Sequence, residues 1–253
     1  MIRPVHGFAE LLATPFAQGV NALCWPRSLA GDFGEVVQQL GPGDLSAAAS
    51  AKEEGIVPLE EERLAGLALS AEGRKAVETM LADLRLLRDA GRDPVLNIIY
   101  GYPRDEDAGP VATDLSAETL VKAEAPLRSR VFARDVFSWH ADSAPVEADT
   151  WLCTYHGAAS EGLLARDARR KVDDPVTRAE LLRLYGGHDD ESFREWLTEN
   201  HYDLHYAPRA GAAPYPFGRH NLWRIACAWP GSPVPPCVHR APDADGPRLL
   251  LIS

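Results

Sequence analysis

The apolar residues of segment 70–91 recur at intervals of three and four positions, which is the pattern of an amphipathic helix. The stripe consists of Val77, Met80, Leu81, Leu84 and Leu87. Ser70 is suited to cap the first turn, and Gly91 is suited to end the last one. The pattern therefore predicts a long helix that lays one face against a sheet.

Shorter helices are predicted where a capping residue precedes a run of helix formers or where glycine follows one. These segments are residues 33–40, 59–69, 116–122, 175–185 and 191–200. The last two lie in a charged stretch, residues 161–200, with apolar runs on either side. We interpret this stretch as a helical insertion between strands.

Short runs rich in β-branched, aliphatic and aromatic residues predict strands. They are residues 95–100, 129–139, 151–155, 221–229, 238–240 and 248–252. Because helical patterns come first and strand patterns later, we predict an α+β fold whose C-terminal half is an antiparallel barrel or jelly roll. We expect one domain, with residues 1–93 mainly helical support and residues 94–253 forming the β core.

The net charge and the apolar runs of the chain disfavour nucleic-acid and membrane partners. The chain of 253 residues has a formal net charge of -11, so it lacks the overall basic surface that nucleic-acid binding requires. No apolar run approaches the roughly 20 residues that span a bilayer, and no signal-peptide core is present at the N-terminus. The four cysteines form no CxxC pair. We expect a cytoplasmic protein with free, buried thiols, a small-molecule substrate and no membrane partner.

Candidate chemistry is concentrated at three residues, His140, Asp142 and His239. Side chains two apart on a strand project from the same face, so His140 and Asp142 can act as adjacent ligands. His239 would add a second imidazole. Two imidazoles and one carboxylate hold Fe(II) on one face and leave the opposite positions open. These residues therefore predict an open iron site.

Arg248 is a further polar residue in an apolar setting. On the predicted strand it shares a face with Leu250 and Ile252, and an arginine on an inward apolar face requires an anionic partner. A ligand carboxylate held in a bidentate clamp would be such a partner. The alternatives are that Arg248 faces outward or pairs with an internal Asp or Glu.

The order HxD, distal His and then Arg in the next strand resembles the signature of the Fe(II)/2-oxoglutarate-dependent dioxygenases. The resemblance implies a double-stranded β-helix, a jelly roll of the cupin-like kind, and the oxidation of a small molecule. It implies that His140, Asp142 and His239 bind Fe(II), and that Arg248 binds the distal carboxylate of the co-substrate 2-oxoglutarate.

A larger part of the chain resembles the uncharacterised domain-of-unknown-function 1826 family. The similar segments are residues 139–142, 152–155, 238–240 and 247–251. This resemblance implies no activity, but it supports treating these segments as one unit. The charged insertion at residues 161–200 departs from the better-known dioxygenases, which leaves the substrate open.

Aromatic and polar residues near the predicted strand ends are candidates for the rest of the pocket. We assign Tyr155 to co-substrate binding. The residues expected to contact the substrate are Trp139, Tyr202, His205, Trp223 and Arg224.

Other functions remain open at the level of sequence. His201 and His205 would share a face if they lay on a helix, and could then bind zinc. His156 and His220 are rival ligands near strand ends. The alternatives are a metal-handling barrel without turnover, an iron oxygenase that does not use 2-oxoglutarate, and a β-barrel interaction module. No GxSxG elbow or glycine-rich phosphate loop favours a hydrolase or a nucleotide-binding protein.

Overall fold

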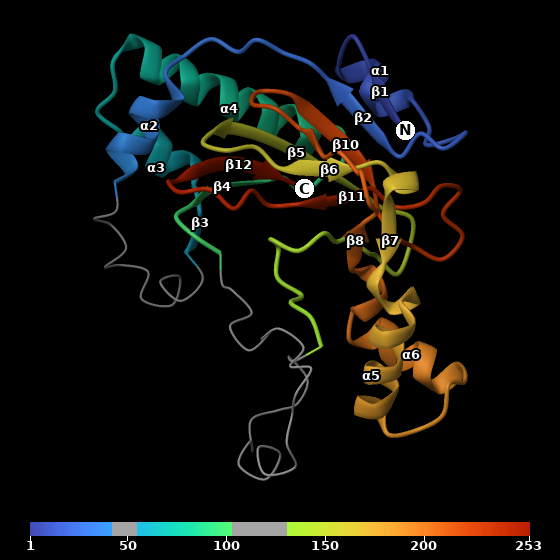
Figure 1. Cartoon of the computed structure of the whole chain (residues 1–253). Helices are drawn as coiled ribbons and strands as arrows, with labels where there is room; N and C mark the ends of the chain where they lie inside the picture. Colours follow the sequence, from blue (N-terminus) through green and yellow to red (C-terminus); the bar gives the residue numbers. More distant parts are fainter. Residues whose placement is uncertain (42–54, 103–130) are drawn as a thin grey trace, which may run out of the picture.

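The computed structural model describes residues 1–41, 55–102 and 131–253. The fold is α+β, with a mixed sheet covered by helices (Figure 1). The predicted helix 116–122 lies outside the described residues. No helix within the described ranges is long and apolar enough to cross a membrane.

The main sheet has seven strands. Their order is β1 (Ile2–Pro4), β2 (Ala22–Trp25), β10 (Leu222–Ala226), β5 (Asp149–His156), β12 (Arg248–Ile252), β4 (Val95–Ile99) and β3 (Ile56–Pro58). Only the β1–β2 pair is parallel, and every other neighbouring pair in this sheet is antiparallel. The central strands β5, β10 and β12 therefore come from the C-terminal part of the chain.

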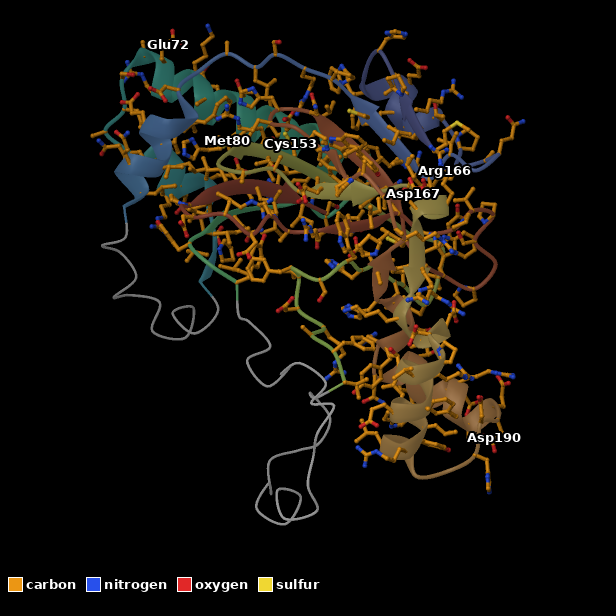
Figure 2. All side chains as sticks on the ribbon, viewed as in Figure 1. Glu72, Met80, Cys153, Arg166, Asp167 and Asp190 are labelled. Carbon is orange, nitrogen blue, oxygen red and sulfur yellow. The ribbon has the colours of Figure 1, made fainter. Side chains whose placement is uncertain are left out.

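Helices cover one face of the main sheet, along which α4 and α2 lie (Figure 1). These helices are α1 (Phe8–Ala13), α2 (Phe33–Leu40), α3 (Glu61–Ala65) and α4 (Ala71–Asp89). The Ser70 hydroxyl caps α4 by accepting a hydrogen bond from the Gly73 N–H, as its position before the helix predicts. Met80 of α4 and Cys153 of β5 are fully buried in the core between helix and sheet (Figure 2). The predicted amphipathic helix is confirmed.

Two smaller sheets accompany the main sheet. One contains β11 (Val238–Arg240), β6 (Glu161–Leu163) and β9 (Tyr215–Pro216), and the other pairs β7 (Ala168–Arg170) with β8 (Tyr206–Pro208). The interior core on the other face of the main sheet includes residues next to β9 and β11. It consists of Ala22, Cys24, Ile99, Leu152, Phe217, Trp223, Ile225, Cys237 and Leu250. Along β5 the side chains alternate, since Leu152 enters this interior core while Trp151 and Cys153 face the helices.

A helical projection extends from β7 and β8, and Asp190 lies far from the main sheet (Figure 2). It contains α5 (Pro175–Tyr185) and α6 (Glu191–Glu199), together with short 3-10 turns at Lys171–Asp173 and Tyr202–Leu204. A further 3-10 turn, Ala165–Asp167, precedes β7. Asp174 caps α5, and Gly186 ends it in the left-handed region at φ 76°. The two predicted helices are confirmed, but β6 belongs to a sheet, so the insertion begins after residue 163.

Two other expectations are corrected. Residues 131–139, the described part of the predicted strand 129–139, form bends and turns. The cause is Asp135, whose Oδ1 accepts hydrogen bonds from the N–H groups of Phe137 and Ser138 in an Asx-type turn. The N-terminal region is also more than helical support, because β1, β2 and β3 add edges to the main sheet.

Candidate metal centre

The structure brings His140 and His239 together as opposite residues of an antiparallel bridge. The His140 N–H donates to the His239 carbonyl at 2.9 Å, and the His239 N–H donates to the His140 carbonyl at 2.8 Å. Residues that exchange both bonds project their side chains from the same face. The ring centroids are accordingly 4.6 Å apart. The pairing joins residues that are distant in the sequence.

Asp142 completes a group of three potential metal ligands. Its Oδ2 lies 3.8 Å from Nε2 of His239, and one ligand atom from each of His140, Asp142 and His239 lies within 4.8 Å of the other two. The His239 side chain is 12% exposed and that of Asp142 is 32% exposed, so the group is reachable from solvent on the Asp142 side. Within the part of the chain that the structure describes, this is the one such cluster.

Both imidazoles are oriented by backbone carbonyls. Nδ1 of His140 lies 2.7 Å from the Ser138 carbonyl, and Nδ1 of His239 lies 3.4 Å from the Cys237 carbonyl. A carbonyl can only accept, so Nδ1 carries the proton and Nε2 keeps its lone pair for a metal. Burial lowers the pKa of His140, and nearby His239 lowers it further. The ring is therefore neutral at physiological pH, which is the form that binds a cation.

The Asp142 carboxylate is held by Thr150 of β5. The Thr150 hydroxyl donates to Oδ2 of Asp142 at 2.6 Å, and it lies 3.3 Å from the Cys227 sulfur. Burial raises the pKa of the Cys227 thiol to about 11, so it stays protonated beside the carboxylate. The Asp142 carbonyl accepts the Ala228 N–H at 2.7 Å, which anchors the backbone. Two imidazoles oriented through Nδ1 and one oriented carboxylate are therefore a donor set that fits Fe(II).

We expect Thr150→Val to weaken Fe(II) binding by roughly ten- to a hundredfold, the range observed when the hydrogen-bond partner of a metal ligand is removed. Valine keeps the β-branch but cannot donate to Asp142. Competition with a chelator under anaerobic conditions measures the change in Kd. Thr150→Ser retains the hydroxyl and is expected to bind as the wild type does. Equal affinities in the valine and serine variants would remove Thr150 from the site.

Arg248 is buried at the start of β12, and no charged group of a described residue pairs with it. It is 4% exposed, and Leu250 on the same strand face belongs to the interior core, so the predicted inward orientation is confirmed. Its Nη1 donates to the Tyr102 hydroxyl at 2.9 Å and its Nη2 to the Ser160 hydroxyl at 3.2 Å, while Nε has no hydrogen-bond partner among the described residues. Burial lowers the pKa of Arg248 and Tyr102 opposes this, but a guanidinium remains charged. None of its hydrogen bonds is to a carboxylate of a described residue.

Strand alternation directs two of the predicted pocket residues away from the cluster. Trp139 immediately precedes His140 and faces the opposite side. There it packs on the outer face of the β11–β6–β9 sheet, and the Arg240 guanidinium lies 4.5 Å from the centroid of its ring. Arg224 follows Trp223 on β10, so its side chain points to the opposite face of the sheet from Trp223. Its guanidinium pairs with Asp149 at 2.5 Å and donates to carbonyls at the end of α1. We no longer assign either residue to the substrate.

Tyr155 and Tyr202 are also not brought to the cluster. Tyr155 faces the helices, and its hydroxyl donates to Oδ2 of Asp83 on α4 at 2.6 Å. Tyr202 is fully buried in the core of the helical projection. Of the predicted pocket residues, Trp223 lies in the interior core and His205 lies beside His140, with ring centroids 6.2 Å apart. These two alone keep their assignment.

The rival histidines do not form a metal group of three. His201 has a left-handed backbone at φ 59° and only a 3-10 turn separates it from His205, so the two do not share a helical face. His220 packs on Phe33 with ring centroids 5.0 Å apart, and its Nε2 lies 3.2 Å from the Tyr155 carbonyl. The four cysteines are free and buried, as predicted.

Sequence reasoning did not single out Tyr102, Ser160 or Thr150. Each acts through a single hydroxyl in contact with a distant residue, and a lone hydroxyl carries no spacing signal. Comparisons with known proteins give no match to any family model, curated protein or solved structure. The two resemblances named from the sequence therefore remain predictions.

Proposed function

We propose that this protein is a non-haem Fe(II) oxygenase that uses 2-oxoglutarate to hydroxylate a small-molecule substrate. The observation that carries the proposal is the combination of two imidazoles and a carboxylate with a buried arginine in the same β core, an arginine that forms no ion pair with a described residue. The first group suits Fe(II) with open positions, and the second suits a dicarboxylate co-substrate.

The strand pairing supports the finer part of the fold prediction, a double-stranded β-helix. In an eight-stranded jelly roll, strands pair one with eight, two with seven, three with six and four with five. The matching pairs here are β4 with β12, the segment at His140 with β11, β5 with β10, and β6 with β9. On this assignment the second strand is reduced to the His140 bridge, and α5 and α6 lie in the connection between the fourth and fifth strands. Under this proposal the two packed sheets form a cupin-like barrel.

The chain's own residues have distinct roles under this proposal. His140, Asp142 and His239 would hold the iron, and Thr150 orients the carboxylate of Asp142. When bound, iron would supply the hydroxylation of a carbon–hydrogen bond with O2 as the oxidant and 2-oxoglutarate as the reductant, so that one oxygen atom enters the substrate and the other enters the succinate left after loss of CO2. Arg248 would bind the distal carboxylate of 2-oxoglutarate and orient it.

The side chains in contact with Arg248 are the reason that an anion is expected there. Tyr102 and Ser160 present hydroxyls to the guanidinium, and each can also donate to a carboxylate. Within the described part of the chain the buried Nε has no partner, and an unsatisfied buried donor is costly. Binding an anionic ligand removes that cost and excludes water from the charge pair. A co-substrate with a carboxylate at each end could bind Arg248 with one carboxylate and the metal with the other.

We expect Arg248→Ala to weaken 2-oxoglutarate binding by well over tenfold, because loss of a buried charged contact costs on the order of 2–5 kcal/mol. Iron binding should be retained, since Arg248 is not a ligand. The measurement is an anaerobic titration of 2-oxoglutarate into the Fe(II) protein, followed by the metal-to-ligand absorption band. Arg166→Ala is the matched control, because the Arg166 side chain is 80% exposed.

The same titration separates this proposal from its alternatives. A band in the wild type that Arg248→Ala weakens and Arg166→Ala does not change would support the co-substrate role. Iron binding without any band would favour an iron oxygenase of another kind or a metal-handling barrel. The cytoplasmic location expected from the sequence also stays a prediction.

A further inference from the structure

Backbone pairing extends the ligand pair His140 and His239 into a row of side chains that runs from the β11–β6–β9 sheet to the β7–β8 sheet. His140 is bridged on one side to His239 and on the other to His205, so the three imidazoles project from one face. The β7–β8 ladder pairs Arg170 with Tyr206, and the next N–H, that of Lys171, donates to the His205 carbonyl at 2.8 Å. Lys171 therefore continues the row. We call His239, His140, His205 and Lys171 the histidine row.

The other end of the row is closed by an aromatic ring. Gly162 is opposite His239 on one side and opposite Tyr215 on the other. A Cβ atom at Gly162 would meet the Tyr215 ring at 2.3 Å, so the ring lies over the glycine. A ligand can therefore extend along the row only toward His205 and Lys171.

His205 is buried at the open side of the row with an unsatisfied nitrogen. It is 5% exposed, and no described residue forms a hydrogen bond with its Nδ1. Buried polar atoms without partners are rare, and one beside a candidate metal ligand indicates a ligand contact. Phe132 packs on the ring with centroids 5.8 Å apart and forms an apolar wall.

Lys171 adds a cation at the end of the row. Its ammonium lies 4.6 Å from the centroid of the Phe132 ring, and it is within ion-pair distance of no described carboxylate. Asp135 acts on it electrostatically without forming an ion pair. A half-buried lysine over an aromatic ring, next to an unsatisfied imidazole, is suited to an anionic group.

We propose that His205 and Lys171 bind a carboxylate of the substrate, which makes the substrate class a small organic acid with an apolar chain between this carboxylate and the oxidised carbon. The inference rests on the proposed oxygenase function for the identity of the neighbouring metal. Strands in a sheet are spaced about 4.8 Å apart, so Lys171 and His140 are separated by roughly 10 Å of backbone. A chain of several carbons is needed to connect the two positions.

The test uses sodium hexanoate as the probe and hexanamide as its neutral analogue. Calorimetry on the full-length protein, anaerobic with Fe(II) and saturating 2-oxoglutarate, should show saturable hexanoate binding and at least about tenfold weaker hexanamide binding. Lys171→Met should weaken hexanoate by roughly tenfold and leave hexanamide unchanged. Lys75→Met, at an exposed lysine on α4, is the matched control. His205→Phe is a second variant, expected to weaken both probes.

The outcomes are distinguishable from those of the co-substrate titration. Calorimetry detects hexanoate whether or not 2-oxoglutarate binds, and dependence on Lys171 separates this subsite from binding at Arg248. Absence of saturable hexanoate binding in the wild type would overturn the proposal. Equal hexanoate affinity in the wild type and Lys171→Met, or hexanamide binding as tightly as hexanoate, would overturn it as well.

Discussion

Asp142→Ala is expected to lose nearly all bound Fe(II) while the protein stays folded. The carboxylate is the only anionic member of the ligand group, so its removal leaves two imidazoles to hold a dication. His140→Ala and His239→Ala should have the same effect, since each removes one of three protein ligands. The fold should persist because the interior core is formed by apolar residues that these changes leave in place.

The measurement is iron content after anaerobic loading and desalting, with circular dichroism as the check on folding. His205→Asn is the matched control, because His205 belongs to the same row and is not in the ligand group. It should retain iron at the wild-type level. Full occupancy in any of the three alanine variants would remove that residue from the site.

Asp83→Ala is expected to lower the free energy of unfolding by about 3–5 kcal/mol, the cost of leaving one member of a buried ion pair uncompensated. Oδ1 of Asp83 accepts a hydrogen bond from Nη1 of Arg27 at 2.6 Å, and both side chains are only 7% exposed. Oδ2 accepts the Tyr155 hydroxyl at 2.6 Å. The variant would leave the Arg27 charge and the Tyr155 hydroxyl buried between α4 and β5.

The loss should appear as a decrease in Tm on the order of 10 °C for a chain of this size. Asp89→Ala on the same helix is the control, because Asp89 is exposed and such changes stay within about 0.5 kcal/mol. Tyr155→Phe should have an intermediate effect on Tm and no effect on 2-oxoglutarate affinity. A Tm for Asp83→Ala within a degree of the wild type would show that the buried pair does not stabilise the fold. A changed affinity in Tyr155→Phe would instead return Tyr155 to the co-substrate site.

The hydrogen bonds of Asp83 with Arg27 and Tyr155 also support the metal centre from the helix side of β5. Nη2 of Arg27 donates to the Cys153 sulfur at 3.2 Å, and burial raises the pKa of that thiol to about 12. Arg27, Asp83 and Tyr155 therefore cross-link the loop after β2, helix α4 and strand β5 on the helix side of the main sheet. The opposite face of β5 presents Thr150 to Asp142. A well-anchored β5 keeps that hydroxyl in place.

Local patterns in the sequence determined the elements with strong periodicity and some of the chemistry. The stripe from Val77 to Leu87 identified α4, and the two-residue period of the last strand put Arg248 on the same face as Leu250, while the structure decided that this face is inward. The same period placed His140 and Asp142 as neighbours in the cluster. These features depend on residues close in the chain, where side-chain direction follows directly from backbone geometry.

Tertiary structure alone decided which distant segments meet. The pairing of His140 with both His239 and His205, and the position of Lys171 next in the row, depend on strand register between segments far apart in the chain. Likewise, the packing of α4 on one face of β5 decided that Tyr155 contacts Asp83 and not the metal cluster. Short strands such as β1, β3 and β9 have too few residues to show a period, so only their pairing with neighbouring strands defines them. Register is set by packing and turns across the whole fold, and no local pattern encodes it.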